Sequence, residues 1–129
     1  MTATTAECKQ VIGRYLQALS GQAKTPDLVA RWVTDPHLAE HIEQAEAAFP
    51  CYELIADELI AERDLVMMRG TFRGAHQGSF AGIPATGRSV SAPLMIVYRL
   101  ANSRIVEHWM QFDAGAVIAQ LQQASVAHA

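Results

Sequence analysis

The residues best suited to chemistry lie close together near the C-terminal end, in the run RIVEHWMQFD from Arg104 to Asp113. A carboxylate held against an apolar wall has a raised pKa and can exchange protons near neutral pH. Asp113 beside Trp109 could therefore act as a general acid/base, with Gln111 orienting a substrate carbonyl. In a strand, alternate residues share a face. The spacing predicts one face with Ile105, Glu107, Trp109, Gln111 and Asp113, and the opposite face with Val106, His108, Met110 and Phe112.

A structural role explains the same residues equally well. Asp113 comes directly before Ala114-Gly115 and could cap a C-terminal helix, since aspartate is a favoured N-cap residue. The spacing alone slightly favours this cap. His108 is on the other strand face, and its only role could be to hydrogen-bond in the core or at an interface.

A second group, His37-Leu-Ala-Glu40-His41, has the H-x-x-E-H spacing of one class of zinc metalloproteases. Its histidines are four apart on a predicted helix, so both rings could reach one ion. A zinc site needs a further protein ligand, and the chain is small for such a protease. We interpret the group as an exposed helix face and expect no bound metal.

The stretch GIPATGRS at 82–89 is one residue from a phosphate-binding loop, with Arg88 in place of the lysine. Such a loop follows a strand and opens a helix, whereas this stretch lies between two predicted strands. We therefore predict a strand connection in which Gly82 and Gly87 adopt positive φ, and no nucleotide cofactor.

Three further residues are weaker candidates. Tyr15 lies on the apolar stripe of the first predicted helix, where it belongs to the core unless its hydroxyl enters a cavity. His76 ends the second predicted strand and could simply fix the turn. Arg69 and Arg73 share a strand face and are expected to form surface pairs with glutamates such as Glu53 and Glu58.

The elements that must position these side chains are clear from periodicity. Apolar residues recur at helical spacing in the N-terminal third, and runs rich in β-branched and aromatic residues follow. This order predicts an α+β fold, with helices covering one face of a curved antiparallel sheet and an apolar pocket between them. The predicted helices are Thr4–Ser20, Pro26–Val33, Pro36–Phe49 and Gly115–Gln123, and the predicted strands are Tyr52–Ala61, Leu65–His76, Val90–Ala101 and Arg104–Phe112.

Length and composition narrow the function classes. The 129 residues are expected to form a single domain over 1–129, and the net charge of −3 without a basic cluster argues against nucleic-acid binding. No apolar run approaches membrane-spanning length and no signal peptide is evident, so we expect a cytoplasmic protein with no membrane partner. Cys8 and Cys51 fit no disulfide framework.

From Phe49 to Leu121 the chain resembles the SnoaL-like polyketide cyclase family, in the subgroup predicted to be ester cyclases. The resemblance rests on FRGAHQGSFAGIPATGR at 72–88, VYRL at 97–100, RIVEHW and QFD within 104–113, and a final QL. It implies the nuclear transport factor 2-like α+β cone and a homodimer. It also implies ring closure by intramolecular aldol condensation without metal or cofactor. The family's acid/base aspartate matches Asp113, and its motif histidines match His76 and His108.

The chain departs from the family pattern at several positions. The strand segment Leu94–Val97 is apolar where the cyclases carry polar side chains, Ser103 replaces a glycine, and Ala85 replaces a proline. These differences are compatible with the family fold, but they do not specify a polyketide as the substrate.

Two functional hypotheses follow. The first is an enzyme that performs cofactor-independent acid/base chemistry, cyclisation or isomerisation, on a hydrophobic carbonyl substrate. The second is a non-catalytic module that binds a small ligand in the same pocket, and a structural subunit is a further alternative. Under the first hypothesis the catalytic residues are Asp113, His108 and Gln111, and the substrate-binding residues are Tyr15, Phe72, His76, Met95 and Trp109.

Overall fold

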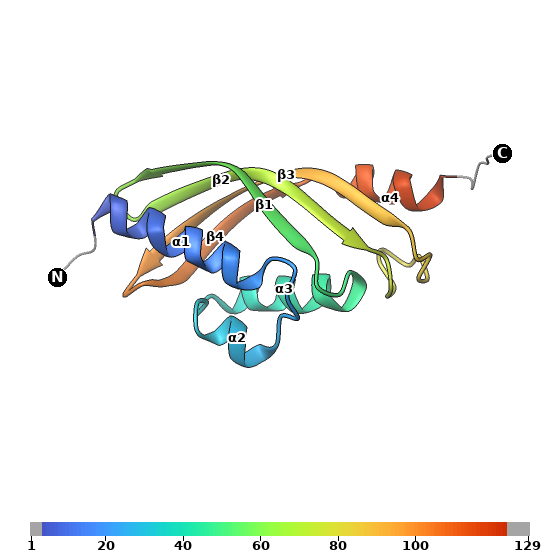
Figure 1. Cartoon of the computed structure of the whole chain (residues 1–129), viewed down its shortest axis with the longest axis horizontal. Helices are drawn as coiled ribbons and strands as arrows, with labels where there is room; N and C mark the ends of the chain where they lie inside the picture. The colour runs from blue at the N-terminus through green and yellow to red at the C-terminus, as the bar shows by residue number, and fades with distance from the viewer. Residues whose placement is uncertain (1–3, 124–129) are drawn as a thin grey trace.

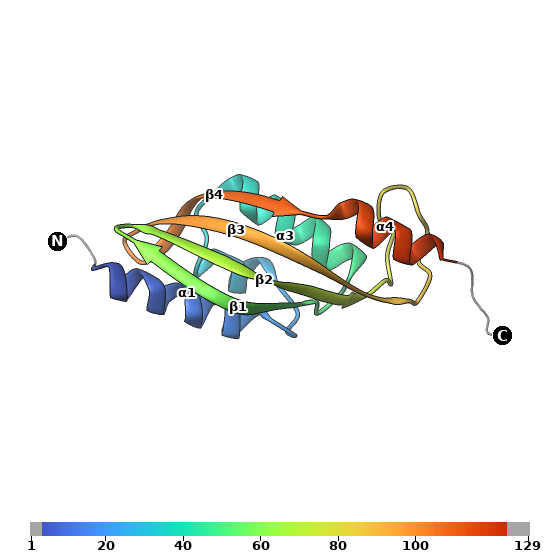
Figure 2. The same ribbon diagram turned by 90° about the horizontal axis from the view of Figure 1, so that it is seen from above.

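A four-stranded antiparallel sheet arches over three helices that cover its concave face (Figures 1 and 2). The computed structural model describes residues 4–123. The strands follow one another in the order β1-β2-β3-β4, so each pairs with its neighbour in the sequence. The elements are α1 Thr5–Leu19, α2 Pro26–Ala30, α3 Pro36–Ala48, β1 Glu53–Glu62, β2 Leu65–Ala75, β3 Ser89–Ala101, β4 Arg104–Phe112 and α4 Ala114–Gln122.

The first three helices begin where the sequence provides capping side chains. Thr4 and Glu7 form a reciprocal capping box at α1. Thr25 caps α2 and Asp35 caps α3, and in both helices a proline occupies the first turn, where no amide hydrogen is needed. The caps agree with the predicted helix starts and fix the point at which α3 crosses beneath the sheet.

The second helix is shorter than its sequence pattern indicates, because it ends at Ala30 and not at Val33. The residues after it pair with the start of β4 instead of continuing the helix. The Ile105 amide donates to the Trp32 carbonyl, and the Thr34 amide donates to the Ile105 carbonyl at 2.9 Å. This backbone pairing ties the α2–α3 connection to the edge of the sheet.

One extra residue in β4 changes the phase of the strand. Arg99 pairs with Glu107 but Leu100 pairs with Ile105, so Val106 is a bulge. Ile105 is therefore fully buried on the concave side together with His108, not on the side of Glu107 as strict alternation predicted. Beyond the bulge the predicted alternation holds.

The core lies between the concave sheet face and the helices. Alternate residues of β2 and β3 are buried against α1 and α3, as their burial patterns show. Full burial of each large apolar side chain contributes roughly 1.5–3 kcal/mol. The core includes Ile12, Tyr15, Leu38, Ile42, Phe49, Val66, Met68, Phe72, Ile96 and Tyr98.

The β2–β3 connection is the predicted non-helical loop. Gly82 and Gly87 have φ of 80° and 72°, and a tight turn joins Phe80 to Ile83 through two backbone hydrogen bonds. His76 holds the loop, because its Nδ1 accepts a hydrogen bond from the Thr86 amide at 3.1 Å. The loop thereby delivers Phe80 to the concave side of the sheet.

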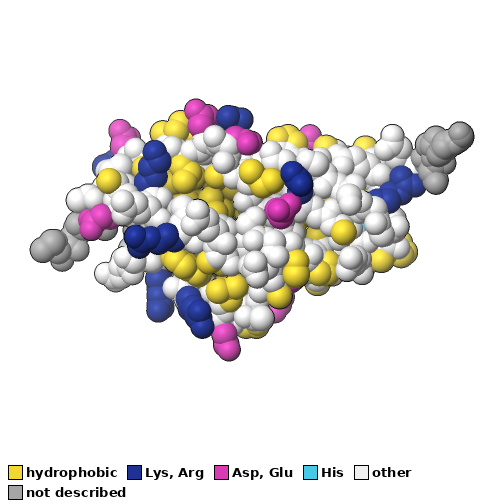
Figure 3. Space-filling model, viewed as in Figure 1, with side chains coloured by type: hydrophobic (Ala, Val, Ile, Leu, Met, Phe, Trp, Pro, Cys, Tyr) yellow, Lys and Arg dark blue, Asp and Glu magenta, His cyan; other side chains and the backbone are white. Residues whose placement is uncertain are grey.

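Charged and apolar groups are mixed over much of the surface. On the side seen in Figure 1, hydrophobic side chains emerge in several small patches among charged ones (Figure 3). Within residues 4–123, none of the helices has the length and apolar character needed to span a membrane.

Candidate functional site

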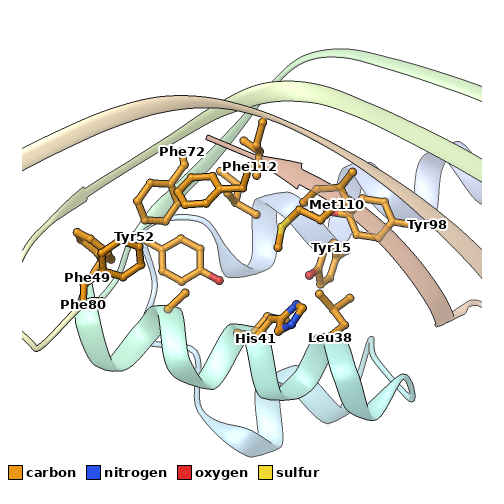
Figure 4. Close-up of a pocket in the computed structure, with 15 residues that line it drawn as sticks. Tyr15, Leu38, His41, Phe49, Tyr52, Phe72, Phe80, Tyr98, Met110 and Phe112 are labelled. Carbon is orange, nitrogen blue, oxygen red and sulfur yellow. The ribbon is translucent and has the colours of Figure 1, made fainter. Parts of the chain in front are cut away.

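An apolar cavity lies between α3 and the concave face of the sheet (Figure 4). Its volume is about 90 Å³. The wall is mostly aliphatic and aromatic, and the groups on it that can hydrogen-bond are His41 and three tyrosines. All four sheet strands or their flanks contribute, and the lining comprises Tyr15, Leu38, His41, Ile42, Ala45, Phe49, Tyr52, Leu54, Phe72, Phe80, Leu94, Ile96, Tyr98, Met110 and Phe112.

Beside this cavity, three ionisable side chains form a hydrogen-bonded series from Asp35 through His108 to His41. Asp35 Oδ1 caps α3 by accepting from the backbone amides of His37 at 2.9 Å and Leu38 at 3.4 Å. Its other oxygen, Oδ2, lies 2.8 Å from His108 Nδ1. His108 Nε2 in turn lies 3.3 Å from His41 Nδ1. The series joins the start of α3, β4 and the next turn of α3.

The environment of Asp35 fixes the direction of these hydrogen bonds. The side chains of Asp35 and His108 are only 7% and 6% exposed. Burial alone would raise the pKa of Asp35, but the hydrogen bonds from His108 and from the two backbone amides outweigh it, so the pKa lies below its ordinary value. Ionised Asp35 can only accept, and His108 Nδ1 therefore carries the hydrogen.

The hydrogen on His108 Nδ1 then determines which of the remaining imidazole nitrogens donate and which accept. When both imidazoles are neutral, His108 Nε2 accepts the hydrogen on His41 Nδ1, and the two rings lie edge to face at 5.3 Å between centroids. This leaves the lone pair on His41 Nε2 free. Because His41 is both exposed and part of the cavity wall, that nitrogen is available at the cavity mouth.

The structure brings three of the residues predicted from the sequence to this site. Tyr15 and Phe72 line the cavity. His108 lies behind His41 and is not among the lining residues, but its Nε2 contacts Nδ1 of His41, which is. Its strand face is the one predicted, opposite Trp109.

The other predicted site residues lie elsewhere. Trp109, Met95 and Gln111 are exposed on the convex sheet face, and Asp113 caps α4 by accepting from the Ala116 amide at 2.9 Å. Gln111 and Asp113 border an open depression of about 570 Å³ on that outer face. The helix cap that the sequence offered as an alternative role for Asp113 is thus the role seen. His76 is buried behind Phe49 and holds the β2–β3 loop.

Sequence reasoning missed Asp35 and His41 as site residues. His41 was noticed only as part of the H-x-x-E-H spacing, and residues 4–123 contain no group of three His, Cys, Asp or Glu side chains placed to hold a metal ion. Asp35 before Pro36 is a strong helix-start signal, and that role hides the second carboxylate oxygen that contacts His108. A buried histidine in β4 could have indicated that a carboxylate was needed nearby.

The helices and the curved antiparallel sheet form the nuclear transport factor 2-like α+β fold. The chain belongs to the SnoaL-like polyketide cyclase family, whose model matches residues 22–121. A search of curated proteins finds no match to this chain.

Solved structures give the same fold. AclR from Streptomyces galilaeus, proposed to be a hydroxylase, is 25% identical and superimposes with a TM-score of 0.79 over 96% of this chain and 87% of that chain. A protein from Acidithiobacillus ferrooxidans, proposed to be a polyketide cyclase, is 20% identical with a TM-score of 0.78, over 95% and 99% of the two chains. IdmH from Streptomyces antibioticus, also proposed to be a polyketide cyclase, is 22% identical with a TM-score of 0.70, over 88% and 97%.

Proposed function

We propose that the protein is an enzyme that performs acid/base chemistry on a small hydrophobic ketone or ester bound in the cavity. The observation that supports this most directly is the Asp35–His108–His41 series at the mouth of an apolar cavity. Proton abstraction requires a base that is oriented by a second group and lies next to a pocket that excludes water. Membership of a cyclase family supports the same reaction class.

In the proposed reaction, His41 Nε2 removes a proton from the carbon next to the substrate carbonyl. The electron pair of the broken C–H bond moves into the carbonyl and gives an enolate, and His41 becomes a cation. The buried carboxylate of Asp35 stabilises that cation through His108, which is a positioning residue. In a cyclisation the enolate carbon attacks a second carbonyl, and the alkoxide that forms takes the proton from the His41 cation. In an isomerisation His41 returns the proton to another carbon of a conjugated enolate.

The assignment shifts the base from Asp113 to His41. Asp113 lies on the convex side, where one oxygen of its carboxylate accepts from the Ala116 amide at the start of α4. In the proposal it stabilises the C-terminal helix, and Gln111 has no contact with the substrate.

The reaction can be tested by exchange of α-hydrogens for deuterium in D₂O, followed by NMR on cyclohexanone and δ-valerolactone. These compounds are compact enough for the cavity and represent ketones and esters. Removing a general base costs roughly 10²–10⁴-fold in rate. We expect His41→Gln to lose the catalysed exchange, His108→Gln to lose most of it, and Asp113→Asn to retain it.

The alternative, a binding module without chemistry, is favoured by the almost entirely apolar cavity wall. It predicts that these compounds raise the melting temperature while wild type and His41→Gln exchange hydrogens at the same background rate. Exchange lost in Asp113→Asn but retained in His41→Gln would instead restore the aspartate as the base.

We also propose that the protein forms a homodimer through the convex sheet face. Paired residues of the four strands form an apolar row across that face, namely Ile60, Met67, Val97 and Trp109. Ile60 is 51% exposed and Trp109 is 49% exposed, which is unusual for large apolar side chains. The charges beside the row are neutralised within the chain, since Arg69 pairs with Glu58 and Arg99 with Glu107.

Light scattering after size exclusion tests this interface. Trp109→Lys should give a monomer, and Gln44→Lys, an equal charge change on exposed α3, should leave the dimer intact. A wild-type monomer at tens of micromolar concentration would contradict the proposal.

A further inference from the structure

One tyrosine hydroxyl in the cavity wall is buried without a partner. Tyr98 on β3 is fully buried, and its Oη has no hydrogen-bond partner among the residues that the structure describes. Its ring packs edge to face with Tyr15, at 5.7 Å between centroids. A buried hydroxyl that lacks a hydrogen bond is destabilising, and proteins satisfy nearly all such groups. The missing partner is therefore expected to come with a ligand.

Two more phenols line the same cavity. In Figure 4 the hydroxyls of Tyr15 and Tyr52 point into the space between the sheet and α3 from opposite sides. Burial raises the pKa of Tyr15, Tyr52 and Tyr98, and each would be raised further by charge on another of the three. All three phenols thus remain protonated and act as hydrogen-bond donors.

Hydrogen-bond donors and acceptors occupy different parts of the cavity. The tyrosines offer donors inside the cavity, and His41 offers a lone pair at the mouth. A volume of about 90 Å³ is far below the roughly 300–1,000 Å³ of pockets for drug-sized ligands. The cavity therefore fits a compact molecule, about one ring in size, with an acceptor oxygen at its buried end.

We propose that Tyr98, flanked by Tyr15 and Tyr52, is the binding site for the substrate's carbonyl oxygen, and that the substrate is a compact one-ring ketone or lactone. The identity of the substrate rests on the proposed function, whereas the oxygen-binding site does not. During proton abstraction the same hydroxyl donates to the enolate oxygen, where a fixed donor in a dry site is most effective. The tyrosine keeps its proton throughout.

Binding of a matched ligand pair tests the site without any turnover. Cyclohexanone and methylenecyclohexane have nearly the same shape, but only the ketone has an acceptor oxygen. A net hydrogen bond of about 0.5–1.5 kcal/mol corresponds to roughly two- to tenfold in affinity. We expect Tyr98→Phe to weaken the binding of cyclohexanone relative to that of methylenecyclohexane by about that factor, in titrations followed by ¹H–¹⁵N NMR, because only the ketone loses a hydrogen bond.

The control variants separate this proposal from the proposed reaction. His41→Gln should keep the wild-type ratio of the two affinities even though it abolishes exchange, and ligand-free Tyr98→Phe should melt no lower than wild type because no bond is lost. An affinity ratio that is unchanged in Tyr98→Phe would overturn the proposal. So would a ratio that changes only in Tyr52→Phe.

Discussion

The role of Asp35 leads to a quantitative comparison with Asp113. Both aspartates cap a helix, but only Asp35 also binds a histidine, through Oδ2 at 2.8 Å. Asparagine caps as well as aspartate, so Asp→Asn removes the charge and keeps the cap. In Asp35→Asn, a charge-assisted bond of about 1.5–3 kcal/mol becomes a neutral one of about 0.5–1.5 kcal/mol. We expect a loss of about 1–1.5 kcal/mol for Asp35→Asn and about zero for Asp113→Asn.

The alanine variants complete the comparison. Asp113→Ala should lose only the cap, about 1 kcal/mol. Asp35→Ala should lose the cap and the whole histidine bond, about 2.5–4 kcal/mol. Urea denaturation at pH 7 measures all four variants against wild type. The pKa of Asp35 is lowered in the folded state, so its contribution is fully present above its ordinary value of 3.8 and declines as the pH falls through the folded value. The difference between wild type and Asp35→Asn should shrink in that acid range.

Asp35→Asn should also reverse the hydrogen bonds beyond it. The new amide donates to His108 Nδ1, which moves the His108 hydrogen to Nε2 and makes His41 Nδ1 an acceptor. His41 Nε2 then carries a hydrogen and is no longer a base. Long-range ¹H–¹⁵N NMR of the imidazoles reports this tautomer directly. An unchanged His41 tautomer, together with equal losses in Asp35→Ala and Asp113→Ala, would refute the reasoning.

Four further substitutions concern stability, and their effects are measured by the same urea denaturation. Lys24→Met should cost about 2–3 kcal/mol, because buried Nζ donates to the Gln22 and Tyr52 carbonyls, both at 2.8 Å; an unchanged midpoint would contradict it. Ser103→Gly should stabilise by about 0.5–1 kcal/mol, since Ser103 has φ of 61°, and a loss would contradict the assigned strain. Gly70→Ala should cost more than about 2 kcal/mol, since its Cβ would lie 2.2 Å from the Ile55 carbonyl oxygen. Gly13→Ala in α1, with nothing within 4 Å, should instead stabilise by up to about 1 kcal/mol.

Local signals in the sequence were sufficient for most of the fold. β4 has the predicted bounds of Arg104–Phe112, because β-branched and aromatic residues fill it and a two-residue turn precedes it. The predicted surface pairs of Arg69 with Glu58 and Arg73 with Glu53 are confirmed, at 3.0 and 3.5 Å. The short turn fixes the register of the Arg69–Glu58 pair, whereas the Arg73–Glu53 pair lies beyond a shift of register between Ala56 and Glu58.

The candidate site could not be predicted from local signals in the sequence. Asp35 and His108 are 73 residues apart, and they meet only because the α2–α3 connection pairs with Ile105. No local pattern indicates that pairing, and the apolar run at Trp32 and Val33 instead suggested a longer helix. The Val106 bulge was equally hidden, since alternation assumes that every strand residue has one partner.

The bulge at Val106 has an evolutionary consequence. Side-chain orientation in a strand depends on whether a position is odd or even, and the bulge resets that parity between Ile105 and the rest of β4. If the bulge were lost without any deletion while Ile105 kept its pairing, every later residue of β4 would move one position along β3 and its side chain would change sides. Trp109, Gln111 and Asp113 would then turn toward the concave side, and Met110 and Phe112 would leave the cavity wall. Deletion of Val106 would instead leave Glu107 paired with Arg99 and His108 paired with Tyr98. Relatives of this chain could thus gain or lose the residue at this point without moving His108 or the cavity wall.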